Sequence, residues 1–155
     1  MTLRRYADTR TFGHAWMALT MVLGAHVIDE ALTDFLSVYN PLVLSARTRL
    51  GWFPMPTFTF ATWLTGLAAL VAVLLVLSLF AYRGAAPLRV LAYPYGVIML
   101  LNGLGHLTAS VYFGRWMPGT TTAPLLLIAS SWLLWTASRN HTYAPHTQRA
   151  AEIDL

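Results

Sequence analysis

Imidazole and carboxylate side chains are concentrated in one short stretch of the sequence, between positions 26 and 34. The stretch contains a histidine, three acids and a threonine, namely His26, Asp29, Glu30, Thr33 and Asp34. At about 100° of rotation per helical residue, the first four fall within an arc of about 100°, and Asp34 widens it to about 140°. A helix would therefore present them as one polar stripe, which suits metal binding or proton transfer.

A second polar pair lies much further along the sequence, within an apolar stretch. Asn102 and His106 are four residues apart, a spacing that puts two side chains on one face of a helix. Tyr95, seven residues before Asn102, falls on the same face. Gly103 and Gly105 flank the pair, and small residues of this kind let a neighbouring helix approach closely.

The composition indicates which elements position these groups. Of the 155 residues, 57% are hydrophobic and 10% are charged, whereas about 25% are charged in typical soluble domains. Four apolar runs approach the ~20 residues that a helix needs to cross a bilayer. They cover residues 14–38, 58–82, 88–112 and 119–138, and a polar tail follows at 140–155. We therefore predict one all-α domain over residues 1–155, folded as an integral membrane four-helix bundle.

The charged residues indicate a membrane surface and argue against nucleic acid as a partner. All ten basic residues are arginines, and with six acids they give a formal charge of +4. They stand at the ends of the apolar runs and form no basic stripe. Seven of the ten lie in the N-terminal segment, the second loop and the C-terminal tail, and three lie on the other side. The positive-inside rule then predicts cytoplasmic N- and C-termini, as in a multi-pass protein of a bacterial inner membrane.

Ionisable groups inside a membrane helix are expensive, so their depth is informative. Each ionised group near the bilayer centre costs about 2.5–3.5 kcal/mol on insertion scales. Glu30 lies 16 positions after residue 14, and His106 lies 18 positions after residue 88. Since the first and third spans run in the same direction, both residues should lie at similar heights in the outer half of the membrane. The start of the fourth span, at 116–120, enters just above them, and its free N–H groups favour a nearby anion.

The first hypothesis for this layer is a metal site. The chain has no cysteine, which excludes thiolate zinc sites, iron–sulfur clusters, disulfides and cysteine nucleophiles. Two imidazoles and one carboxylate with open positions suit catalytic zinc or non-haem iron(II). The predicted ligands of this divalent metal are His26, Glu30 and His106. Zinc would support hydrolysis of a lipid ester or amide, and iron would support oxygen chemistry on a lipid chain.

The remaining polar residues of the layer would complete the catalytic set. Asp29 or Asp34 could be a further ligand, a partner that fixes an imidazole tautomer, or a general base. Asn102 could orient His106 or a bound water. Glu30 would be both a ligand and a catalytic carboxylate.

Two alternatives to the metal site stay open. In one alternative, His26 and Glu30 form a metal-free proton-transfer pair, and like-charge repulsion keeps Asp29 protonated. Such a site suits an isomerase or cyclase of a hydrophobic substrate. In the second, the chain is a non-enzyme that carries protons or cations or binds a small ligand. In each case the partner is a lipid or another hydrophobic small molecule, which we expect to enter sideways from the outer leaflet. An apolar loop at 39–56 could act as its lid, and a homo-oligomer is compatible with the sequence.

The ordered polar motifs resemble those of a known family. His26-Val27-Ile28-Asp29-Glu30, followed by Asn102-x-x-x-His106 and then by Pro118-Gly119 with Thr122-Ala123, is similar to the HXXEE family of small integral membrane proteins. The resemblance covers roughly residues 20–135, and Asp29 stands where the family usually has glutamate. It implies a membrane enzyme that uses this polar site, and it does not name a substrate.

Overall fold

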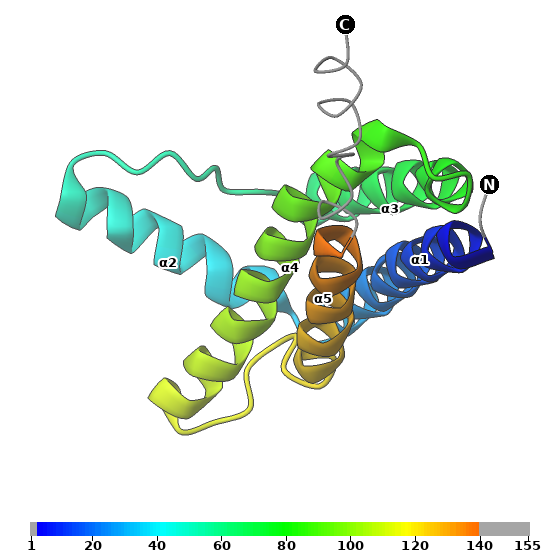
Figure 1. The fold of residues 1–155 in the computed structure, drawn as a ribbon. Coiled ribbons are helices and arrows are strands. Elements are labelled where there is room, and N and C mark those ends of the chain that lie inside the picture. Colours follow the sequence, from blue (N-terminus) through cyan, green and yellow to red (C-terminus); the bar gives the residue numbers. More distant parts are fainter. Residues whose placement is uncertain (1–2, 140–155) are drawn as a thin grey trace, which may run out of the picture.

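The chain folds entirely into helices over the part that the structure describes. The computed structural model describes residues 3–139, which form five α-helices and no strand (Figure 1). They are α1 (Leu3–Leu32), α2 (Phe35–Leu50), α3 (Phe60–Tyr82), α4 (Ala86–Phe113) and α5 (Ala123–Ser138). The predicted all-α class is confirmed, and the predicted polar tail at 140–155 lies outside the described residues.

Three of these helices are long and apolar enough to cross a membrane, which supports the prediction of an integral membrane protein. The qualifying segments are Ala7–Leu32, Phe60–Tyr82 and Ala86–Phe113. The fourth predicted span, 119–138, is shorter than expected, because α5 has 16 residues where a full span needs about 20. The chain at 114–122 forms turns instead, and Gly114 and Gly119 both have positive φ angles there. Five helices, of which three meet the spanning length, therefore replace the four predicted.

The first predicted span, 14–38, also ends differently. The helix begins eleven positions earlier, at Leu3, and stops at Leu32, because Asp34 adopts a left-handed conformation with φ 57° and ψ 51°. Aspartate is one of the few residues besides glycine that adopts this conformation readily. The chain then forms a separate helix, α2, over most of the region where a lid loop was expected at 39–56.

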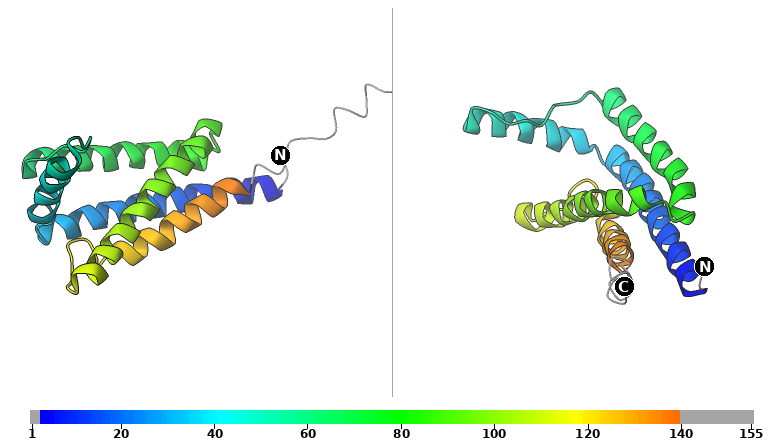
Figure 2. Two further views of the ribbon diagram at one scale, coloured as in Figure 1. Left: turned by 90° about the vertical axis from the view of Figure 1, so that its left-hand side faces the viewer. Right: turned by 45° about the horizontal axis from the view of Figure 1, so that its top comes forward.

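Helix α2 and the segment after it form a hairpin across one end of the molecule (Figure 2). The side chain of Asn40 donates to the carbonyl of Phe58 at 2.9 Å and accepts from the Phe58 N–H at 3.1 Å. The Tyr39 hydroxyl donates to the carbonyl of Pro56 at 3.0 Å. Burial raises the pKa of this hydroxyl, and the charge of Arg47 opposes the shift. Tyr39 therefore stays protonated and keeps its role as a donor.

The other four helices bring the two polar motifs to the same end of the molecule. Helix α1 packs against α3 and α5, and α5 packs against α4. Helices α1 and α4 run in one direction, and α3 and α5 return (Figure 2). The shared core of these helices contains fully buried Phe12, Trp16 and Leu19 of α1 and Leu126 and Leu133 of α5.

The two glycines beside His106 behave differently from each other. A Cβ on Gly103 would lie 3.0 Å from the carbonyl oxygen of Ala123, so its absence allows α4 and α5 to approach closely, as predicted. A Cβ on Gly105 would meet no atom within 4 Å. The prediction that Gly105 also serves helix packing is therefore wrong, because its position opens onto empty space.

Candidate metal centre

Three buried side chains from two helices converge near the end of the bundle. His26 and Glu30 come from α1 and His106 comes from α4, with side-chain exposures of 0%, 6% and 9%. The Oε1 atom of Glu30 lies 3.6 Å from Nε2 of His26 and 3.1 Å from Nε2 of His106. The two imidazoles meet edge to face, with ring centroids 4.8 Å apart. The predicted convergence of the first and third spans is confirmed.

The tautomer of His106 is set by the turn that leads into α5. Its Nδ1 lies 2.6 Å from the backbone carbonyl oxygen of Pro118. A carbonyl only accepts hydrogen bonds, so Nδ1 carries the proton and donates it to this oxygen. In the neutral ring, the lone pair is then on Nε2, which faces Glu30.

The tautomer of His26 is set through a threonine. The Thr122 hydroxyl donates to Oδ2 of Asp29 at 2.9 Å, and the Thr122 backbone N–H donates to the same oxygen at 3.1 Å. Nδ1 of His26 lies 2.7 Å from this hydroxyl oxygen. Because the single hydroxyl proton goes to the carboxylate, His26 must donate from Nδ1. Its neutral ring also directs an Nε2 lone pair at Glu30.

The centre therefore contains three hydrogen-bond acceptors, the two Nε2 atoms and the Glu30 carboxylate, and no donor among them. Nε2 of His26 is buried and has no hydrogen-bond partner within residues 3–139, and a buried unpaired polar group costs about 1–3 kcal/mol. One ligand atom from each of the three residues lies within 4.8 Å of the others. Two ligand atoms each about 2.1 Å from a zinc ion in tetrahedral geometry are about 3.4 Å apart, a value between the two observed distances to Glu30. The group could hold a metal ion.

Glycine at position 119 is required for the turn to close over both rings. Gly119 has a φ of +79°, which side-chain-bearing residues rarely adopt. A Cβ there would lie 2.7 Å from Cε1 of His106 and 3.0 Å from Cε1 of His26. The segment 114–122 thus covers the centre and supplies both groups that accept from the imidazoles.

The other predicted site residues lie outside the ligand group. Asp29 is half-buried and holds Thr122, so it is the anion expected at the start of the last helix. Asp34 is exposed at the junction of α1 and α2, and its left-handed backbone takes it away from the α1 stripe. Thr33 is also exposed and donates to the backbone carbonyl of Asp29.

Asn102 lies on the same side of α4 as His106, as its spacing predicted, but it does not orient the His106 ring. It is half-buried one turn before His106, and within the described chain no hydrogen bond joins it to the ligands. The carbonyl of Pro118, not Asn102, orients His106. Asn102 instead lines a pocket that His106 also lines.

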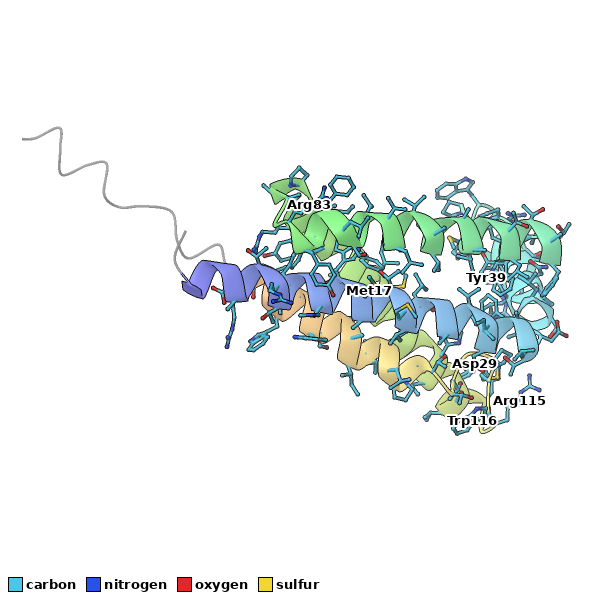
Figure 3. The ribbon with its side chains drawn as sticks, turned by 90° about the vertical axis from the view of Figure 1, so that its right-hand side faces the viewer. Met17, Asp29, Tyr39, Arg83, Arg115 and Trp116 are labelled. Carbon is cyan, nitrogen blue, oxygen red and sulfur yellow. The ribbon has the colours of Figure 1, made fainter. Side chains whose placement is uncertain are left out.

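The chemical roles of Thr122 and of the Pro118 carbonyl were not predicted from the sequence. Both act through a close approach of the α4–α5 turn to α1, which local sequence does not specify. The Pro118-Gly119 pair signals a turn, but only the structure shows that the turn lies against the imidazoles. Figure 3 shows Asp29, Arg115 and Trp116 together at this end of the helices, with Arg83 at the opposite end.

Comparison with known proteins provides no relative for this chain. It matches no protein-family model, and no curated protein and no solved structure is significantly similar to it.

Proposed function

We propose that this chain is a membrane-embedded metal enzyme that acts on a lipid-soluble substrate. The proposal rests on one observation. Two buried imidazoles donate hydrogen bonds from Nδ1, and the unprotonated Nε2 atom of each ring faces a buried carboxylate. In metal sites, ligating histidines characteristically donate their other N–H to a carbonyl, a carboxylate or water in this way. The proposed ligands are His26, Glu30 and His106.

The ligand set supports zinc or iron(II). Two imidazoles and one carboxylate leave coordination positions open for water or substrate. Zinc would supply a hydroxide for hydrolysis of an ester or amide, and iron would support oxygen chemistry on a lipid chain. Asp29 holds Thr122 and through it the tautomer of His26, and Asn102 lies beside His106 where a substrate could reach it.

The membrane setting supports a lipid-soluble substrate. His26 and Glu30 are in one candidate membrane helix and His106 is in another. We propose that α5 is a fourth, short membrane segment and that both termini face the cytoplasm of a bacterial inner membrane. The first turns of α1 and the last turns of α5 lie toward the same end of the bundle (Figure 2), as this topology requires. The ordered motifs also support membership of the HXXEE family.

One contact favours a second candidate, a metal-free acid/base enzyme. Nε2 of His106 and Oε1 of Glu30 are 3.1 Å apart, which is a hydrogen-bonding distance if the two groups share a proton. Such a pair could move a proton on a hydrophobic substrate, as an isomerase or cyclase does. It would still leave Nε2 of His26 without a partner, and this is why we prefer the metal.

Elemental analysis of the detergent-purified protein tests the proposal. We expect about one zinc or iron per chain, lost in His26→Ala and in His106→Ala. His14→Ala is the matched control, because His14 is an exposed histidine of the same helix whose ring meets that of Tyr82 edge to face. A wild-type protein that stays metal-free after loading with zinc, or with iron(II) without oxygen, would refute the metal and leave the acid/base candidate.

A further inference from the structure

A pocket between α2 and α4 reaches the metal centre from the side. It has a volume of about 320 Å³, at the lower end of the ~300–1,000 Å³ typical of ligand pockets. His106 forms part of its wall, so a molecule in the pocket touches a proposed metal ligand directly. The residues that line it include Phe35 and Leu42 of α2 and Leu101, Asn102, Gly105 and His106 of α4.

The pocket opens toward the bilayer. Leu42 and Leu101, on opposite walls, are each 61% exposed. In a candidate membrane helix such as α4, exposed apolar side chains face lipid chains. The pocket thus has exposed apolar side chains at its open side and His106 in its wall, an arrangement that suits access from the hydrocarbon region.

The pocket is polar near His106 and apolar elsewhere. Apart from Asn102, His106 and the Tyr39 hydroxyl, every lining side chain is apolar. The Tyr39 hydroxyl is already bonded to Pro56. The Asn102 amide has no hydrogen bond to another described residue, so its donor and acceptor are available to a bound molecule one helical turn from His106.

Gly105 leaves open space in the wall of this pocket. Its φ is not positive and a Cβ there would meet nothing within 4 Å, so neither backbone conformation nor helix packing requires glycine. Glycine within a helix is nevertheless less stable than alanine. The missing side chain leaves space in the pocket wall directly before His106.

We infer that the α2–α4 pocket binds a single-chain lipid, with its carbonyl or hydroxyl group at Asn102 and its hydrocarbon chain directed between α2 and α4 into the bilayer. The pocket is too small for a whole membrane lipid, so most of the chain stays among its neighbours. This inference rests on the proposed function and names the substrate class of the same centre.

Photo-crosslinking in vesicles tests the inference. The protein is reconstituted in phosphatidylethanolamine and phosphatidylglycerol with methyl palmitate that carries a diazirine part-way along its chain. We expect labelling between Leu101 and Phe113 that excess unlabelled methyl palmitate competes away. In Gly105→Leu the competed labelling should fall about tenfold, because a bulky side chain fills the pocket. Gly105→Ala should retain it.

Gly66→Leu is the matched control for the bulky change. Gly66 lies in α3, a Cβ there also meets nothing within 4 Å, and it lines a second pocket, between α2 and α3, that contains no residue of α4. This variant should keep the labelling of α4. Labelling that competitor does not reduce, or that persists in Gly105→Leu, would overturn the inference.

Metal content measured on the same preparations separates the two proposals. Bound metal without competed labelling would overturn the lipid site and leave the metal centre intact. Competed labelling without metal would support the lipid site and refute the metal enzyme. Gly105→Leu should keep its metal, because a Cβ at position 105 would meet no atom of His26 or Glu30 within 4 Å.

Discussion

Replacing Thr122 by valine tests whether the tautomer of His26 is imposed by its surroundings. Valine has nearly the shape of threonine and has a methyl group in place of the hydroxyl. The change removes the acceptor 2.7 Å from Nδ1 of His26 and the donor 2.9 Å from Asp29. The backbone N–H of residue 122 still donates to Asp29, so the approach of α5 to α1 should persist.

The expected effect is a loss of metal affinity in a protein that keeps its native helicity. Removing an outer partner of a ligating histidine typically lowers metal affinity about 10–100-fold, or roughly 1.4–2.7 kcal/mol. Nδ1–H of His26 is left buried without an acceptor, a penalty of about 1–3 kcal/mol. The ring can escape this penalty by moving its proton to Nε2, which abolishes the lone pair that binds metal.

Zinc competition titrations on the purified variants measure the affinity, and nitrogen chemical shifts of labelled histidine report the tautomer. Thr122→Ser keeps the hydroxyl and should remain close to wild type in both measurements. An affinity of Thr122→Val within about twofold of wild type, in a protein with native helicity, would refute the argument. An unchanged Nδ1–H tautomer in this variant would refute it as well.

Three further predictions concern Gly119, Gly103 and Asp34. Gly119→Ala should abolish metal binding in elemental analysis, because a Cβ would overlap the ring of His106 at 2.7 Å and the positive φ adds about 1–2 kcal/mol of strain. Gly103→Val should lower the thermal stability in detergent by roughly 1–3 kcal/mol, since its side chain would press on the carbonyl of Ala123 at 3.0 Å. Reduced metal content in Gly103→Val at unchanged stability would contradict its assignment to helix packing. Asp34→Ala should leave metal content and affinity unchanged, because this side chain is exposed, and a lost metal would place it in the centre after all.

Much of the site follows from helical geometry. His26 and Glu30 share a face because they are four residues apart. The position of His106 within the third predicted span predicts that it lies at the same height as Glu30. These predictions use only the periodicity of a helix and the direction of each span. The structure confirms that the three side chains converge, because a long helix leaves little freedom in either quantity.

The parts that the sequence did not predict depend on contacts between distant segments. The α1–α2 break has neither glycine nor proline at its turning point, so the left-handed Asp34 gave no clear local signal. The segment 39–56 was expected to be a lid loop because of its apolar composition, but most of it belongs to helix α2, which contains Pro41. The role of Thr122 depends on where α5 meets α1, a tertiary property that no spacing within one helix encodes.

The turn at 114–122 supplies both acceptors that hold the imidazoles, the carbonyl of Pro118 and the hydroxyl of Thr122. Connecting segments elsewhere commonly tolerate insertions, but here one added residue would put at most one of these acceptors in register with its ring. The chain length between α4 and α5 is therefore fixed as firmly as the ligands themselves. A tag or epitope should be inserted after α2, at Gly51, which has no neighbour within 4 Å of its Cβ position, and not into this turn.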